Sequence, residues 1–188
     1  MLKYATSPVW TETVLGDFDR FLLDHAACEK KASSMAMSMV PHYPDKPDLI
    51  RAMIDLAIEE LSHYRDVFRI ISQRKLQLVA DTKDPYIFAF RRHIRHGREA
   101  YLLDQLLVAA IVEARGHERF GLIAEALPEG QLKRFYQAIT SSEARHFQVF
   151  IDLTNSYTNT TKVEQRLAEL LGIEAEITAA LPIRAALH

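Results

Sequence analysis

The sequence contains few of the residues that interrupt helices or cross-link a chain. Among its 188 residues there are six glycines, seven prolines and one cysteine, Cys28. A single cysteine cannot form an internal disulfide, so a disulfide-stabilised secreted fold is excluded and a cytoplasmic location is expected. Because glycine and proline mark tight turns, their scarcity disfavours a turn-rich β fold and favours long helices.

The sequence also lacks a long apolar run and a strong net charge. No run reaches the roughly 18 apolar residues of a membrane span, and the first residues have no apolar signal core. Hydrophobic residues make up 48% of the chain and charged residues 26%, as in soluble globular proteins. The formal net charge of −2 does not by itself indicate a nucleic-acid partner. We expect a single domain over residues 1–188 with no membrane partner.

Four long segments carry apolar residues at the three- and four-residue spacings of an amphipathic helix. The predicted helices cover about residues 12–39, 48–73, 99–127 and 128–156, with Pro128 at the start of the fourth. A shorter fifth helix is predicted from a Thr161–Glu164 capping box to about Gly172, and the tail to residue 188 is helical in part. No segment alternates apolar and polar residues as a half-buried strand would. The fold class is therefore predicted to be all-α.

Residues 74–98 form a long connector between the second and third predicted helices. A connection of that length is unusual inside a compact domain and indicates a crossover along a helical bundle rather than a tight turn. We therefore expect a core bundle over about residues 12–156 and a helical extension over about residues 161–188.

Two Glu-x-x-His motifs occur, one in the second predicted helix and one in the fourth. Each begins 30 or 31 residues after a glutamate on the preceding helix. The six residues are Glu29, Glu60, His63, Glu113, Glu143 and His146. Within each pair the two glutamates are about equally far from the intervening turn, so an antiparallel hairpin places them at the same height. Residues three apart share a helix face, so each Glu-x-x-His can reach one point.

All six side chains fall on the apolar stripes of their helices. Four buried carboxylates would each cost several kcal/mol in desolvation without positive charge, and no lysine or arginine lies on those stripes. Two divalent ions would supply that charge, and carboxylate with imidazole suits iron or manganese. One Glu-x-x-His motif arises often by chance, but two copies, each level with another buried glutamate, favour a dinuclear site. Ferritin-like four-helix bundles hold two metal ions with this ligand set.

Three neighbouring residues are weaker candidates. Glu118 is predicted to form a salt bridge rather than to bind metal. His25 lies one turn before Glu29 and is a ligand, a group that contacts a ligand, or a core histidine, of which the last two are favoured. His117 is close to Glu113 but has no counterpart in the repeat.

Four short segments resemble the tRNA 2-methylthio-N6-isopentenyladenosine hydroxylases. They are Asp24–Ala32 (DHAACEKKA), Glu59–Tyr64 (EELSHY), Glu113–Phe120 (EARGHERF) and Ser142–Phe147 (SEARHF). The resemblance continues in register from about Trp10 to Tyr157. It departs from the family pattern at His117, where a cysteine is expected in many members.

The resemblance implies a non-haem di-iron monooxygenase that hydroxylates the isopentenyl group of the hypermodified adenosine next to the anticodon in tRNA. It implies one iron held by Glu29, Glu60 and His63 and another by Glu113, Glu143 and His146, with glutamates bridging. Molecular oxygen would be the co-substrate, and a ferredoxin- or reductase-type protein would donate electrons. A monomer would suit an enzyme that docks on tRNA.

A basic cluster in the connector is consistent with an RNA partner. Its arginines are Arg91, Arg92, Arg95 and Arg98. Arginine suits bidentate contacts to phosphate, so the cluster could bind tRNA. On composition alone, a solvated loop explains it equally well.

Other functions remain open from the sequence. A di-iron oxidase or peroxidase could act on a small molecule or on iron without RNA. An iron-storage bundle would need a closed multimeric shell. A helical interaction module without metal would leave four buried carboxylates without countercharge, and it is the least favoured reading.

Overall fold

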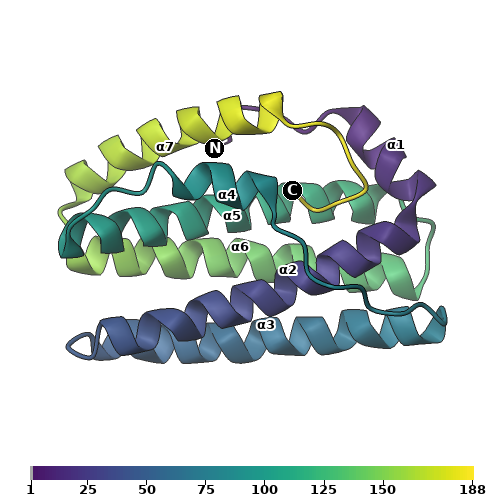
Figure 1. Ribbon diagram of the computed structural model, residues 1–188, viewed down its shortest axis with the longest axis horizontal. Coiled ribbons are helices and arrows are strands. Elements are labelled where there is room, and N and C mark those ends of the chain that lie inside the picture. The colour runs from purple at the N-terminus through teal and green to yellow at the C-terminus, as the bar shows by residue number, and fades with distance from the viewer. Residues whose placement is uncertain (1) are drawn as a thin grey trace. The chain divides into compact units, whose positions relative to one another are not determined.

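A computed structural model describes residues 2–188, and every regular element among them is helical (Figure 1). The α-helices are α1 (Pro8–Gly16), α2 (Phe18–Met39), α3 (Pro47–Gln73), α4 (Pro85–Arg91), α5 (Arg98–Ala126), α6 (Gln131–Tyr157) and α7 (Thr160–Ala180). A short 3-10 helix, Val40–His42, follows α2. The all-α prediction is confirmed. Among residues 2–188, no helix has the length and apolar character needed to cross a membrane.

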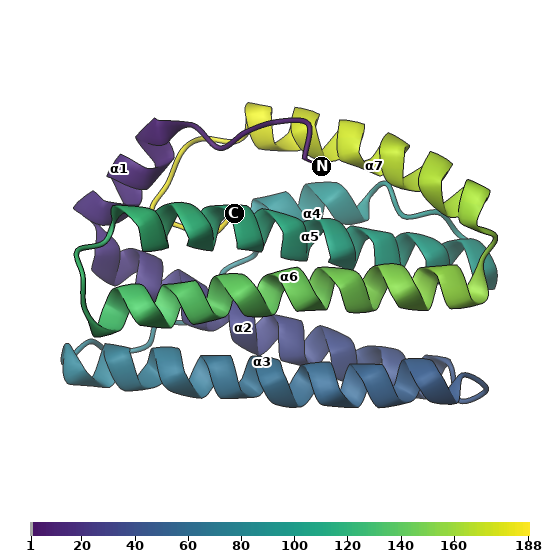
Figure 2. The ribbon, with the colours of Figure 1, turned by 180° about the vertical axis from the view of Figure 1, so that it is seen from behind.

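The chain forms two compact units. The α2–α3 unit consists of residues 12–82 and 184–187, and the α5–α6 unit consists of residues 2–11, 83–183 and 188. In each unit, the two long helices lie side by side and antiparallel in both ribbon views (Figures 1 and 2). The organisation of residues 1–188 as one domain stays a prediction.

The α2–α3 unit is held by the apolar faces of its two long helices. The buried apolar residues are Phe21, Leu22, Ala26, Ala36 and Met39 on α2, and Leu49, Met53, Leu56, Val67 and Ile71 on α3. Pro47 is the first residue of α3, where its missing N–H is not needed. The turn at Pro41–Pro47 thus joins two helices that pack along their whole stripes.

The prediction of one continuous first helix from residue 12 is wrong, because the helix is interrupted at Asp17. α1 ends at Gly16, and the Asp17 side chain accepts a hydrogen bond from the Arg20 amide at 3.4 Å. Aspartate at this position satisfies an amide in the first turn of α2, so a new helix starts there. Leu15, predicted on the buried stripe, is 39% exposed.

The α5–α6 unit has α5 at its centre. Sixteen of the 29 residues of α5 are buried, which places α5 against neighbours on more than one face. α6 begins at Gln131, so the prediction that it starts at Pro128 is wrong. Leu127 is extended (φ −74°, ψ 144°), as expected for a residue that precedes a proline, and this ends α5 before the turn.

α7 differs from the predicted fifth helix at both ends. Asn159, and not Thr161, caps it, because the Asn159 side chain accepts a hydrogen bond from the Thr161 amide at 3.0 Å. The helix also continues through Gly172 to Ala180. Leu171 and Glu174 are buried beside that glycine. Tertiary contacts therefore outweigh the roughly 1 kcal/mol by which glycine disfavours a helix.

The connector contains α4, which the sequence analysis missed. The Asp84 side chain caps α4 by accepting hydrogen bonds from the amides of Tyr86 at 2.8 Å and Ile87 at 3.3 Å. Tyr86 and Phe90 are 1% and 0% exposed and belong to one apolar cluster with residues of α5 and α7. Seven residues are too few to show a helical period in the sequence.

Candidate metal site

The α2–α3 unit brings Glu29, Glu60 and His63 together, and we name these residues the α2–α3 triad. Glu29 projects from α2, and the other two project from one face of α3. His63 Nδ1 lies 3.6 Å from Glu29 Oε2 and 3.3 Å from Glu60 Oε2. Glu29 is 3% exposed and Glu60 is 1% exposed, whereas His63 is only partly buried. Each residue offers one ligand atom within 4.8 Å of those of the other two.

Burial and crowding shift the proton affinities of the α2–α3 triad. Burial, together with the nearby Glu60 carboxylate, raises the pKa of Glu29. For His63, burial lowers the pKa, but hydrogen bonds to Glu29 and Glu60 outweigh that effect and raise the pKa to about 9. At neutral pH the His63 imidazole therefore favours its protonated, positively charged form beside the two carboxylates. A divalent cation bound by His63 would displace that proton.

His25 fixes one oxygen of Glu29. The His25 ring is fully buried, and its Nε2 lies 2.6 Å from Glu29 Oε1. The other oxygen, Oε2, is the one that lies near His63. The structure therefore places His25 as a hydrogen-bonding neighbour of Glu29, one of the readings that the sequence favoured.

The α5–α6 unit brings Glu113, Glu143 and His146 together, and we name these residues the α5–α6 triad. All three are buried, with exposed fractions of 5%, 6% and 2%. His146 Nδ1 lies 3.6 Å from Glu113 Oε2, and its Nε2 lies 3.4 Å from Ser142 Oγ. The three residues each offer a ligand atom within 4.8 Å of the others.

Gly116 makes room for Glu143. A Cβ atom at Gly116 would lie 2.7 Å from Glu143 Oε2, closer than side-chain atoms approach one another. The absence of a side chain on α5 at this position lets the carboxylate of α6 reach the α5 backbone. Gly116 therefore provides the space that the Glu143 carboxylate occupies. The sequence did not predict this role.

The residues of both triads fit a divalent metal ion. Each triad offers two carboxylates and one imidazole, the oxygen and nitrogen donors that suit iron or manganese. Buried carboxylates without compensating charge are strongly unfavourable, so a cation would stabilise each cluster. The structure thus groups the six predicted ligands three by three. That they bind metal stays a prediction.

The α5–α6 unit contains a buried ion pair that the sequence did not predict. Arg115 is fully buried, and its Nε and Nη2 donate to Glu174 at 2.8 and 2.9 Å. Tyr86 and Thr178 also donate to Glu174 Oε1, at 3.1 and 2.8 Å. Arg115 follows Glu113 by two positions and so faces away from the triad. The face of α5 that carries Arg115 is buried only because α7 packs against it.

The other residues near the motifs make local contacts. Glu118 pairs with Arg115 and accepts from the Thr6 amide, so the predicted salt bridge is present. His117 is exposed, and its Nδ1 lies 2.9 Å from the Thr140 carbonyl oxygen. His117 therefore links α5 to α6 at the surface.

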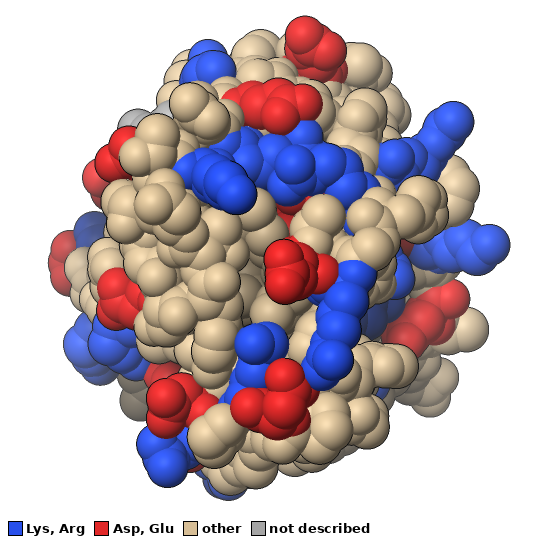
Figure 3. Space-filling view, turned by 90° about the vertical axis from the view of Figure 1, so that its left-hand side faces the viewer, with Lys and Arg blue, Asp and Glu red and all other residues tan. Residues whose placement is uncertain are grey.

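The arginines of the connector are exposed but not equivalent. Arg91, Arg92, Arg95 and Arg98 are all exposed. Arg95 makes two side-chain hydrogen bonds to Asp104, at 2.6 and 3.0 Å, and Arg166 holds the same carboxylate. Lys and Arg side chains gather in a band on the face that Figure 3 draws.

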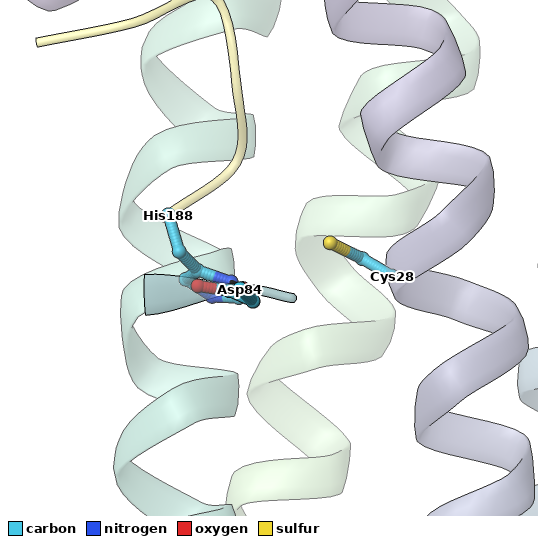
Figure 4. A group of neighbouring side chains, drawn as sticks. All are labelled: Cys28, Asp84 and His188. Carbon is cyan, nitrogen blue, oxygen red and sulfur yellow. Dashed lines mark hydrogen bonds and ion pairs between the residues drawn. The ribbon is translucent and has the colours of Figure 1, made fainter. Parts of the chain in front are cut away.

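An ion pair anchors the start of α4 (Figure 4). Asp84 Oδ2 lies 3.0 Å from His188 Nδ1, and the His188 ring stacks on Tyr86 with centroids 4.7 Å apart. Burial raises the pKa of Asp84, but His188 and two backbone amides outweigh it and lower the pKa to about 2. Cys28, also drawn, belongs to the α2–α3 unit and donates weakly to Asp24 at 3.8 Å.

The sequence matches the family described as tRNA-(MS[2]IO[6]A)-hydroxylase (MiaE) over residues 1–188. A tRNA 2-(methylsulfanyl)-N(6)-isopentenyladenosine(37) hydroxylase from Pseudomonas putida strain KT2440 is 36% identical over 176 residues, 94% of this chain and 85% of that protein. The protein of the same description from Salmonella typhimurium strain LT2 is 34% identical over 130 residues, 69% of this chain. That second match spans 47% of the relative, about half its length.

A solved structure has the same fold. "Protein 43 with aldehyde deformylating oxygenase activity from Synechococcus" aligns with a TM-score of 0.94 at 34% identity, covering 100% of this chain and 94% of that one. The ferritin-like fold predicted from the sequence is confirmed. A family match along the whole sequence, together with a relative more than one-third identical over 94% of it, decides the classification. This chain belongs to the MiaE family of tRNA hydroxylases.

Proposed function

We propose that this protein is an enzyme that hydroxylates the isopentenyl group of the hypermodified adenosine next to the anticodon in tRNA. The observation that carries the proposal is the family match over residues 1–188, with relatives described as hydroxylases of that nucleoside. The two buried triads support it, because a redox-active metal that these residues suit could activate oxygen for hydroxylation of an allylic methyl group.

We further propose that the α2–α3 triad and the α5–α6 triad each hold one iron ion. Glu29, Glu60 and His63 would bind the first, and Glu113, Glu143 and His146 the second. Their burial and their donor types support this assignment. Bound iron would supply the activation of molecular oxygen.

The protein's own residues hold and shield this chemistry. His25 keeps Oε1 of Glu29 engaged, so that Oε2 is the oxygen offered towards His63. Ser142 lies beside Nε2 of His146 and orients that imidazole. Because the carboxylates are almost fully buried, bulk water is excluded from them, which favours transfer of hydroxyl to substrate over side reactions.

The reaction needs partners outside this chain. One oxygen molecule, two electrons and two protons convert a C–H bond to C–OH and water. We propose an electron donor of the ferredoxin or reductase type, a monomeric enzyme and a cytoplasmic tRNA substrate.

Nucleoside analysis of tRNA tests the proposed function. In cells that lack this chain, the hydroxylated prenyl-adenosine is expected to disappear and its unhydroxylated precursor to accumulate. Expression of the chain should restore the hydroxylated form, as measured by mass spectrometry of digested tRNA. An unchanged nucleoside pattern in both strains would refute the proposal.

A small-molecule oxygenase is the second candidate function. The likeness to the Synechococcus protein with aldehyde deformylating oxygenase activity, over the whole of this chain, favours it. Purified iron-loaded protein with a reductant should release formate from a long-chain aldehyde if this function holds. Formate release together with no hydroxylation of tRNA would support it over the tRNA hydroxylase.

A further inference from the structure

The outward face of α4 presents one aromatic ring and two cations. Phe88 is 59% exposed, and Arg91 and Arg92 are also exposed. At about 100° per residue, Arg91 lies roughly 60° to one side of Phe88 around the helix and Arg92 roughly 40° to the other. An exposed phenyl ring is therefore flanked by two guanidinium groups on the next turn.

The opposite face of α4 is fixed to the interior of the α5–α6 unit. Tyr86 and Phe90 are buried in the cluster that includes Leu107 of α5 and Leu170 of α7. The Tyr86 hydroxyl donates to Glu174. These contacts hold α4 in place, so a ligand on its outer face would not have to order the helix first.

The arginines of the connector divide into two kinds. Arg95 is committed to Asp104 through its side chain and its backbone amide. In contrast, neither Arg91 nor Arg92 forms an ion pair within residues 2–188, so their donors face solvent. The two cations beside Phe88 are therefore those available for an external anion.

We propose that Phe88, Arg91 and Arg92 bind an unpaired nucleotide of the tRNA. The nucleobase stacks on the Phe88 ring, and the arginines contact the phosphates on either side of it. This inference rests on the proposed function, and it assigns the RNA contact to α4 rather than to all four arginines of the connector.

The chemistry of the surface favours RNA over a protein partner. Proteins recognise single-stranded RNA by stacking bases on aromatic side chains while arginines contact the backbone. Large exposed apolar patches often mark protein-docking surfaces, but the neighbours of Phe88 on the outer face are charged. Arg95 acts here as a positioning residue that holds the connector through Asp104.

Binding of a labelled anticodon stem–loop RNA to the full-length protein tests the inference. Dissociation constants are measured at several salt concentrations for Phe88→Ala, Phe88→Trp and the double variant Arg91→Gln/Arg92→Gln. Phe68→Ala and Arg51→Gln serve as matched controls, because Phe68 is 42% exposed and the Arg51 side chain is 73% exposed on α3. Thermal melting confirms that each variant is folded.

Stacking and phosphate contacts leave different signatures. Phe88→Ala should weaken binding by about 5- to 100-fold without changing the salt dependence, and Phe88→Trp should restore it. The double arginine variant should reduce the slope of log K against log salt by about 1.4, since each lost phosphate contact removes about 0.7. Both controls should bind like the wild type.

Other outcomes would overturn the inference. If Phe88→Ala binds with wild-type affinity, the base does not stack there, and a protein partner becomes the better explanation of the exposed ring. If the double arginine variant keeps the wild-type salt slope, the phosphates lie elsewhere. In either case, wild-type binding and tRNA hydroxylation would remain intact, which separates this failure from failure of the proposed function.

Discussion

The two triads consist of the same residue types at nearly the same spacing, but their surroundings differ. Glu29 accepts a hydrogen bond from His25, one turn earlier on α2. The residue one turn before Glu113 on α5 is Ala109, which offers no such donor. The predicted ligands therefore repeat along the chain, but the residues that position them do not.

A second difference lies three residues after each first glutamate. On α5 this position is Gly116, and Glu143 Oε2 fills the space that a side chain would take. On α2 the corresponding residue is Ala32. One triad is thus restrained by a hydrogen bond, and the other has a carboxylate lodged against a glycine. We expect two metal positions with unequal affinity.

Removal of a ligand should have the largest effect. Glu60→Ala and Glu143→Ala are each expected to lower bound iron from about two per chain and to abolish hydroxylation. Each variant removes one of the two carboxylates of the triad to which it belongs. Metal analysis of purified protein, alongside nucleoside analysis, measures both. Iron left in Glu60→Ala reports on the α5–α6 triad, and iron left in Glu143→Ala reports on the other. Glu129→Ala, whose side chain is 87% exposed and lies outside both triads, is the control. Full iron content in either ligand variant would end the assignment.

The residue two positions after Glu29 and the residue two positions after Glu113 should contribute very differently to stability. Arg115 is buried against Glu174, whereas Lys31 bonds the Thr82 carbonyl oxygen at the surface at 2.9 Å. Arg115→Met should destabilise the protein by about 3–5 kcal/mol, since it leaves a buried carboxylate without its partner. Lys31→Met should change stability by no more than about 0.5 kcal/mol. Chemical denaturation measures both, and equal effects would contradict this comparison.

Filling the space beside Gly116 should damage the α5–α6 triad selectively. Gly116→Ala places a methyl group 2.7 Å from Glu143 Oε2, so the carboxylate must move and iron affinity should fall by about 100-fold. Gly121→Ala is the matched control on the same helix, because its Cβ would meet Thr140 Cγ2 at an ordinary 3.6 Å. It should stabilise α5 by about 0.5–1 kcal/mol and leave iron binding unchanged. Wild-type iron affinity in Gly116→Ala would show that the space is not needed.

Loss of the His25 hydrogen bond should weaken the α2–α3 triad more modestly. His25→Ala is expected to lower the iron affinity of that triad about tenfold, because Glu29 Oε1 loses its donor and the carboxylate can rotate. His25→Gln keeps an N–H donor and should recover part of the affinity. Competition with a chelator measures the dissociation constant directly. Equal affinities in His25→Ala and the wild type would mean that the two triads are not distinguished in this way.

The smallest expected effect concerns pH and the anchor of α4 in the α5–α6 unit. The pKa of Asp84 is lowered from 3.8 to about 2 in the folded protein, mainly by His188 against the opposing effect of burial. The stabilisation of the folded protein by the ionised Asp84 carboxylate is therefore fully present above about pH 4 and is lost as the pH falls towards 2. Asp84→Asn keeps a side-chain oxygen for the helix cap and removes the titration. The difference between wild-type and variant stability should shrink across that range in acid denaturation.

Local signals predicted most of the helices and their approximate ends. Apolar periodicity located α3, α5 and α6 to within three residues at each end, and it located the C-terminal end of α2. Errors arose where capping decided the boundary, at Asp17 and at Asn159. α4 was missed because its seven residues show no period, and it is held mainly by contacts of Tyr86 and Phe90 with distant helices.

The candidate site was predictable because its chemistry repeats at fixed spacing. The sequence alone predicts six residues with that spacing, and within each unit the structure brings three of them together. Gly116 was not recognised, because a glycine inside a helix gives no indication of which side chain approaches it. Arg115 was also missed, since its partner Glu174 lies 59 residues away in the sequence.

The order of apolar, acidic and imidazole residues along this chain determined that it is helical and which helix faces carry the donor atoms. Those properties depend on neighbours three or four positions away, and the sequence contains them completely. Contacts between distant segments determine which second face of a helix becomes buried. They also determine which carboxylate oxygen is restrained and which arginines are available to a ligand. Only the packed structure decided these, because burial and charge pairing are properties of side chains brought together in space.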